Sequence, residues 1–331
     1  MYDLESHRNG ESSAGSYPEE LDSSKGRIEM NSTDLSFRTL WRLVGERDAW
    51  SPSRLTLRFK KILLATAHAA DQLQILAIVS HPAYRGLKRA YPRLPFKYLE
   101  DKYLAHGFTR EERAACLLHH YRRLLRSLPH GVLRGLPECA AVLLEMRDEG
   151  ATYTVTMNLP ELFQDEGELS LNLQADGEEI FVLSFTVVPG RVVQSEAEEV
   201  LLITRLQGVP GKYEQIHQMT KAMHDVGPGA FLIAVLQGIA ETWDIREMAG
   251  ICARKHRSYE ERYAELLTIA YDDFFMELGA VQNGKGLFVS PIPLPLKPLA
   301  QVKAGHKLRT RKKRAFKQEI AAQVSRTLQE L

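Results

Sequence analysis

The sequence predicts a mixed α/β protein in which an N-terminal helical region packs on a mixed, largely antiparallel sheet flanked by helices. Three observations support this fold class. Apolar residues have helical spacing up to about residue 136, and the spacing changes to the alternation of strands near Gly150. In the four consecutive segments that follow, apolar and polar residues alternate as they do in strands. After Gly208 the chain returns to helix, strand, helix and strand, an order typical of one sheet covered by helices.

Composition limits the classes of protein to which the chain can belong. Its 331 residues are enough for one large core with helical additions, and its 43 basic and 42 acidic residues nearly cancel. Such a protein is not devoted as a whole to nucleic acid or to acidic membranes, so any charged partner must bind locally. The three cysteines are far apart, which argues against a disulfide framework or a zinc site, and we expect no metal.

Residues 1–33 are polar, acidic and rich in Ser and Gly, a composition typical of a disordered tail. They contain no basic segment followed by an apolar one, as a signal peptide would. Apolar runs elsewhere are shorter than the ~20 residues that a membrane-spanning helix needs. We therefore expect a cytoplasmic protein.

Residues 34–149 are expected to form the helical region. Apolar residues share one stripe of a helix within 55–63 and again within 114–125. Thr109 and Glu112 have the spacing of a capping box that begins the second helix. Three prolines between the two stripes predict short helices joined by turns.

The sheet domain is expected to span residues 150–302. Its first strands read TYTVTMNL, GELSLNLQ, EIFVLSFTVV and EEVLLITRLQG, and Asp176-Gly177 predicts a hairpin turn between the second and the third. These strands predict an antiparallel meander. The elements expected next are a helix over 212–224, a helix after Gly227, a strand in DIREMAGICA, a helix over 258–279 that ends at Gly279, and a strand in GLFVSPI.

Two glycines and a proline stand directly before the most apolar stretch of the chain, HDVGPGAFLIAVLQGIA (224–240). A helix that begins there leaves its first backbone N–H groups free. It also directs the positive end of its dipole at whatever lies in front, which suits a phosphate. A buried core helix with a glycine-rich start has the same sequence, so both interpretations stay open.

Three other motifs favour structural roles. GAVQNGKG (279–286) has the spacing of a phosphate loop, but a glycine stands where Ser or Thr should bind magnesium, so we predict a hairpin turn. His119 and His120 are adjacent on a helix and diverge too far to bind one metal, so one of them is expected in the core. Cys252 and His256 could pair as thiolate and base only if the chain turned back between them, and we favour an inert core thiol.

Seven blocks, in one order, carry a resemblance to a known family: RLPFKYLEDKYL, ERAACLLHHYRRL, GELSLNLQADGEEIFVLSFTV, LLITRLQGVPG, MTKAMHDVGPGAFLIAVLQGIA, YDDFFMELG and KLRTRKKRAFKQEI. With them the chain resembles the VirK/YbjX family of Gram-negative bacterial proteins over about residues 60–318. The resemblance implies a connection with virulence and with tolerance of cationic antimicrobial peptides, and implies no particular reaction. HDVGPG departs from the family pattern, in which His-Gly precedes a basic residue and Pro.

The order of elements is also similar to that of the acyl-CoA N-acyltransferase (acetyltransferase) superfold. There a glycine loop at a helix N-terminus binds the pyrophosphate of the cofactor. In this chain His224 differs from the first residue of that loop, and Pro228 removes one N–H donor. By this similarity, the residues implied to bind an acyl-CoA are Gly227, Gly229, Ala230, Gln207 and Gly208.

The same similarity implies catalytic residues. A later helix of the superfold often carries a Tyr four residues before its closing glycine, where this chain has Phe275. Tyr271 lies one turn earlier on the same face, and would replace that Tyr as the acid that protonates the leaving thiolate. Arg205, with Gln207, would line the channel for the acceptor.

Residues 303–331 are expected to form a basic C-terminal helix. Its first part, KAGHKLRTRKKRAFK (Lys303–Lys317), has eight Lys or Arg and no acid. A solvated helix face is one interpretation, and contact with anionic lipid at the periphery of the inner membrane is the other. Nucleic acid is disfavoured because no aromatic stacking platform stands beside the run. Deletion of 303–331 is expected to leave the fold intact.

Three classes of function remain open. An acyltransferase would move an acyl group from acyl-CoA or a similar thioester to a small-molecule or peptide acceptor. A non-catalytic virulence or envelope-stress protein would bind a lipid or a peptide. A nucleic-acid-binding protein would depend on the basic run alone.

Overall fold

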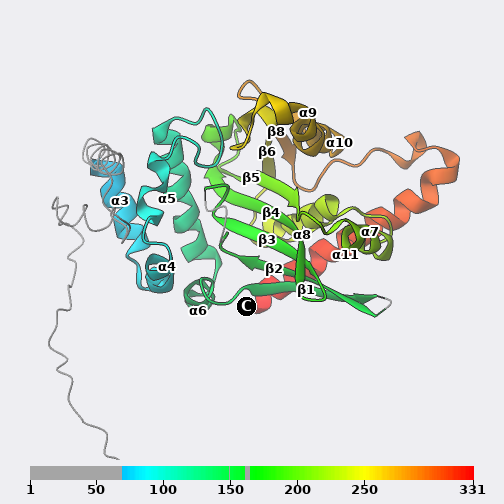
Figure 1. Ribbon diagram of the computed structural model, residues 1–331, viewed down its shortest axis with the longest axis horizontal. Helices are drawn as coiled ribbons and strands as arrows, with labels where there is room; N and C mark the ends of the chain where they lie inside the picture. The colour runs from blue at the N-terminus through cyan, green and yellow to red at the C-terminus, as the bar shows by residue number, and fades with distance from the viewer. Residues whose placement is uncertain (1–68, 149, 161–164) are drawn as a thin grey trace, which may run out of the picture.

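The computed structural model describes residues 69–148, 150–160 and 165–331. In these ranges an eight-stranded sheet has the N-terminal helices on one side and later helices on the other (Figure 1). The predicted mixed α/β fold class is confirmed. The predicted tail 1–33 and the stripe within 55–63 lie outside the described residues, and the division into domains stays a prediction.

Four α-helices precede the sheet in the described ranges. They are α3 (Ala69–Val79), α4 (Arg85–Ala90), α5 (Arg110–Ser127) and α6 (His130–Gly135). The predicted capping box begins α5: the Thr109 hydroxyl accepts from the Glu112 N–H at 3.2 Å, and the Glu112 carboxylate accepts from the Thr109 N–H at 2.9 Å. The buried stripe of α5 includes Leu117 and Tyr121 and faces the sheet.

The segment AVLLEMRD is a strand, β1 (Ala141–Asp148), although it lies within the predicted helical region, residues 34–149. It pairs antiparallel with β2 (Ala151–Asn158). The pairing register shifts between Val142 and Leu144, so Leu143 and Leu144 are both buried. This bulge removes the alternation by which a strand is found in a sequence.

The antiparallel meander continues through β3 (Leu169–Ala175), β4 (Glu178–Pro189) and β5 (Glu199–Gly208). The predicted turn joins β3 to β4, with positive φ at both Asp176 and Gly177. The pairing then changes from antiparallel to parallel, because β6 (Glu247–Ile251) lies parallel to β5. The strand order is β1-β2-β3-β4-β5-β6-β8-β7, where β7 is Val281–Gln282 and β8 is Leu287–Pro291.

The chain between β5 and β6 forms α7 (Tyr213–Ala222) and the buried helix α8 (Pro228–Thr242). The helix predicted over 258–279 is interrupted: α9 (Ala264–Leu267) and α10 (Phe274–Glu277) flank a π-helical segment, Thr268–Asp273. Gly279 ends it with a φ of 82°. The sequence GAVQNGKG includes the turn between β7 and β8, as predicted for a hairpin.

The last helix, α11 (Lys307–Glu330), packs along α8 (Figure 1). Its apolar side is buried, and Gly238 of α8 lies so close to Ala321 and Val324 that a Cβ has no room there. The expectation that residues 303–331 can be removed without harm to the fold is therefore wrong. The helix covers the core, while its basic residues lie mainly near its start.

None of the helices in the described ranges is both long enough and apolar enough to cross a membrane.

Candidate active site

β5 extends beyond its parallel neighbour. Pairing with β6 involves Leu201, Leu202 and Ile203, whereas β5 continues to Gly208. On its other edge β5 stays paired with β4, with a bulge at Thr204. Residues 204–208 therefore have one edge that no strand of the described chain covers, and the predicted residue Arg205 lies within it.

Tyr271 lies against this edge. The Leu206 N–H donates to the Tyr271 hydroxyl oxygen at 3.3 Å, and the ring is buried. Burial raises the pKa of Tyr271 above its ordinary value, so the hydroxyl keeps its proton at neutral pH. Tyr271 belongs to the π-helical segment, and such segments are frequent at functional sites.

Glu166, which was not predicted from the sequence, lies in the same cluster. Its carboxylate is 3.6 Å from Arg205 Nε and 3.9 Å from His256 Nε2. No described residue donates a hydrogen bond to it. Burial raises the pKa of Glu166, and the positive charges of Arg205 and Arg257 oppose that rise. A single Glu before a strand carries no pattern that would have identified it.

Glu166 is held in place by its neighbours in the chain. Its carbonyl oxygen accepts from the Thr204 hydroxyl at the bulge of β5. Gly167 has a φ of 147°, and a Cβ there would be 2.9 Å from Ser184 Cβ. The chain can therefore approach β4 this closely only because residue 167 is a glycine.

His256 enters the cluster from the end of β6. A 3-10 turn, Ala253–Lys255, turns the chain back, and the imidazole lies 4.9 Å from the ring of Tyr271 between centroids. The Ser258 N–H donates to Nδ1 at 3.2 Å, which leaves the proton on Nε2, toward Glu166. Burial, together with the charge of Arg205, lowers the pKa of His256 to about 4. The imidazole interacts with Glu166, Tyr271 and Ser258. The pair with Cys252 that was considered from the sequence is not among its described contacts.

The structure thus brings the two predicted catalytic residues together with two others. The cluster at the end of β5 consists of Glu166, Arg205, His256 and Tyr271. It offers a carboxylate with a raised pKa, a neutral imidazole, a guanidinium and a protonated phenol. A carboxylate and a phenol with such pKa values can accept and donate a proton, and a guanidinium can bind an anion.

The residues predicted to bind the cofactor differ in their surroundings. Gly227 caps α8 without a side-chain hydrogen bond, and a Cβ there would have no neighbour within 4 Å among the described atoms. Gly229 lies against Phe274 and Leu206, and Ala230 follows it in the first turn. Leu206 thus places the start of α8 beside the end of β5. Gln207 is exposed there.

Gly208, the last of the predicted cofactor-binding residues, packs against the side chains of Ile216 and Phe181. The loop before α8 contacts α11, since Asp225 pairs with Arg309 at 2.7 Å and its carbonyl accepts at 2.5 Å from Lys313. Two cations of the basic run therefore lie near the start of α8.

A second buried carboxylate, Glu168, contrasts with Glu166. It accepts from Lys97 Nζ at 2.6 Å, from the Tyr103 hydroxyl at 2.7 Å and from the Tyr121 hydroxyl at 2.5 Å. A buried charge with this many donors is fully paired, and it fastens the N-terminal helices to the sheet. Glu168 is therefore a structural residue.

Neither His119 nor His120 belongs to the cluster at the end of β5. His120 is the predicted core histidine: its Nδ1 accepts from the Val187 N–H at 3.1 Å, and burial lowers its pKa to about 3. In the part of the chain that the structure describes, no group of three or more His, Cys, Asp or Glu residues could hold a metal ion.

Comparison with known proteins identifies the family and leaves the reaction open. The family model described as "Protein of unknown function (DUF535)" matches residues 50–326. Curated proteins and solved structures give no match, so the similarity to the acetyltransferase superfold has no support from them. DUF535 corresponds to the VirK/YbjX family that the seven blocks indicated. The match covers most of the chain, which therefore belongs to the DUF535 family.

Proposed function

We propose that the protein is an acyltransferase that uses an acyl-CoA or a similar thioester and that its reaction takes place at the end of β5. The observation that carries the proposal is the state of Glu166. This carboxylate is buried, its pKa is raised, and no described residue donates a hydrogen bond to it. A structural carboxylate in this protein, Glu168, has three donors.

Acyl transfer needs a base and an acid, and the cluster offers both. In the proposed reaction Glu166 accepts the proton of an acceptor amine or hydroxyl as that atom forms a bond to the thioester carbonyl carbon. The carbon–sulfur bond breaks, and the Tyr271 hydroxyl gives its proton to the leaving sulfur. A proton from Glu166 or from solvent then restores Tyr271.

The remaining two residues position these groups. His256 has its Nε2 proton toward Glu166 and its ring against Tyr271, so it holds the carboxylate and the phenol in one arrangement. The Arg205 guanidinium lies beside Glu166 at a side-chain exposure of 13%. It can bind an anionic group of the acceptor or oppose charge that develops on the carbonyl oxygen.

The start of α8 supports the donor side of the proposal. No described atom lies within 4 Å of a Cβ at Gly227, α8 directs the positive end of its dipole there, and Arg309 and Lys313 lie nearby. These are the features that suit the phosphates of a CoA thioester. The role expected for Gly229 changes, because a Cβ there would lie only 3.0 Å from Phe274 Cε2. Gly227 is thus the residue that would face the phosphates.

The topology is a second line of support. An antiparallel meander leads into β5, α8 follows, and β6 returns parallel to β5 but pairs with only part of it. This order is similar to that of the acetyltransferase superfold. The proposal extends that similarity to function.

The test is binding of the donor followed by loss of its thioester. Isothermal titration calorimetry of the purified protein with acetyl-CoA and with palmitoyl-CoA should show saturable binding of at least one of them. Release of free CoA thiol, with water as the acceptor, should then be slower in Glu166→Gln while donor affinity is unchanged. The proposal fails if neither thioester binds up to millimolar concentration.

A further inference from the structure

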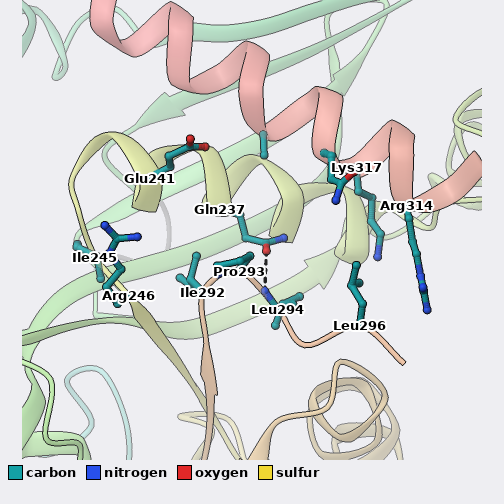
Figure 2. Close-up of a pocket in the computed structure, with 12 residues that line it drawn as sticks. Gln237, Glu241, Ile245, Arg246, Ile292, Pro293, Leu294, Leu296, Arg314 and Lys317 are labelled. Carbon is teal, nitrogen blue, oxygen red and sulfur yellow. Dashed lines mark hydrogen bonds between the residues drawn. The ribbon is translucent and has the colours of Figure 1, made fainter. Parts of the chain in front are cut away.

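A cavity of about 360 Å³ lies between α8, α11 and the chain that follows β8 (Figure 2). It shares no residue with the cluster at the end of β5. Its volume falls in the range of small-molecule sites. The residues that line it are Gln237, Glu241, Ile245, Arg246, Ile292, Pro293, Leu294, Leu296, Arg314, Lys317, Gln318 and Ala321.

Half of this lining is apolar, and the wall after β8 is fixed in place. The Leu294 N–H donates to the Gln237 amide oxygen at 3.0 Å, which fastens this segment to α8 (Figure 2). Ile245 and Ile292 are buried, while Leu296 is 50% exposed at the rim. The cavity is therefore formed before any ligand enters, with an apolar interior that reaches the surface.

The charged residues of the lining are unevenly placed. Figure 2 shows Glu241 and Arg246 at one end, and Arg314 and Lys317 of α11 at the other. Arg246 is already paired with Asp244 at 2.5 Å. The Arg314 guanidinium donates to the Lys297 carbonyl, a neutral group, so its charge is not cancelled by that bond. One end of the cavity is thus cationic.

Lys317 is the residue that most clearly lacks an anion. It is half-buried, and none of the described residues accepts a hydrogen bond from its ammonium or pairs with it. Burial, followed by the charges of Arg314 and Lys313, lowers the pKa of Lys317 below its ordinary value. An anion bound at this end would reverse the effect of those charges.

We infer that this cavity binds a single-chain amphiphile: its alkyl or acyl chain lies on the apolar lining, and its anionic head group pairs with Lys317 and Arg314. The apolar walls favour a chain that makes no hydrogen bonds. The cations favour a phosphate or carboxylate over a neutral or cationic head. This inference does not depend on the acyltransferase proposal, because no residue of the cavity takes part in that reaction.

The experiment is a calorimetric titration of the full chain with decyl phosphate below its critical micelle concentration. Decanol and decyltrimethylammonium serve as neutral and cationic amphiphiles of the same chain length, and inorganic phosphate serves as the head group alone. We expect saturable binding of decyl phosphate with one site per chain. Decanol should bind at least about tenfold more weakly, and inorganic phosphate should not compete at the same concentration.

Variants of one helix provide the matched control. Lys317→Gln should weaken decyl phosphate binding about tenfold, because it removes the cation from the cavity. Lys312→Gln removes an exposed cation of the same helix that does not line the cavity, and should leave the affinity unchanged. The melting temperature of each variant shows whether the fold is kept.

Several results would overturn the inference. One is equal affinity for decyl phosphate and decanol, which would remove the role of the cations. Another is equal loss of affinity in Lys312→Gln and Lys317→Gln, which would show that the charge of α11 as a whole attracts the ligand. Competition by inorganic phosphate at the same concentration would show that the apolar lining contributes nothing.

Discussion

The ring of Phe274 occupies the space into which a side chain at Gly229 would extend. A Cβ at Gly229 would lie 3.0 Å from Phe274 Cε2 and 3.3 Å from Phe274 Cζ. The absence of a side chain at Gly229 is thus explained by packing between α8 and α10. Any ligand at the start of α8 would approach Gly227 instead, and the two glycines can be tested separately.

Gly229→Val should destabilise the protein by about 1–3 kcal/mol, because the added atoms must displace the Phe274 ring. Urea unfolding measures the change. The double variant Gly229→Val, Phe274→Ala should recover part of the loss, since the neighbour that causes the clash is gone. If the two substitutions were simply additive, the packing explanation would be wrong.

Gly227→Asp should change stability and donor affinity in opposite directions. The carboxylate caps α8 and interacts well with its dipole, so the melting temperature should rise. The same negative charge should weaken acyl-CoA binding at least about tenfold by calorimetry. Gly227→Asn is the matched control: it adds a similar cap without the charge and should leave the affinity nearly unchanged. Equal affinities for the two variants would place the phosphates elsewhere.

Tyr271→Phe should lower thiol release and leave donor affinity in place, because only the proton donor is removed. It also leaves the Leu206 N–H without its acceptor, which should cost about 1–3 kcal/mol in urea unfolding. Tyr263→Phe, at an exposed tyrosine nearby, should change neither quantity. Full thiol release by the Tyr271 variant would assign the proton donor to another group.

His256 should make the stability of the protein depend on pH. Its pKa is about 4 in the folded protein and 6.5 ordinarily, so the folded state favours the neutral imidazole. Its contribution is complete above pH 6.5 and is lost as the pH falls toward 4, by about 2–3 kcal/mol. Urea unfolding of His256→Gln should therefore show a smaller decline over this range. His217→Gln, an exposed histidine of α7, should follow the wild-type curve.

Gly238→Ala should destabilise the protein, although alanine favours helix formation over glycine. The added methyl group meets the Ala321 backbone and Val324, so α11 must shift away from α8. Gly131→Ala in α6 is a matched control, because a Cβ there has no neighbour within 4 Å among the described atoms. Thermal unfolding should show opposite signs for the two variants. A neutral Gly238→Ala would mean that the contact between the helices is loose.

The parts of the fold that the sequence predicts are those with a local cause. Alternating residues gave the meander of β2 to β5, and the capping box gave the start of α5. β1 was missed because the bulge at Val142 places two leucines in succession on the buried side. The packing of α11 on α8 was not predicted, because it depends on the absence of a side chain at Gly238. The sequence does not show that α11 lies beside this glycine.

Two residues of the candidate site were predicted from the sequence, and two were not. Tyr271 and Arg205 were proposed from a resemblance of the element order to the acetyltransferase superfold, for which the solved structures give no match. Glu166 and His256 join them only through the turn at the end of β6 and the close approach of Gly167 to β4. Such proximity is a property of the folded chain and has no local spacing in the sequence.

The dependence of α8 on α11 also bears on how the protein is made. The strands of the meander pair with their neighbours in sequence, so they can form early during synthesis. α8, the most apolar helix, is followed by more than sixty residues before α11 begins at Lys307. On the ribosome, the side of α8 that α11 later covers is therefore exposed to solvent while those residues are added. Chains interrupted before α11 would expose that side, and they are natural substrates for chaperones and proteases.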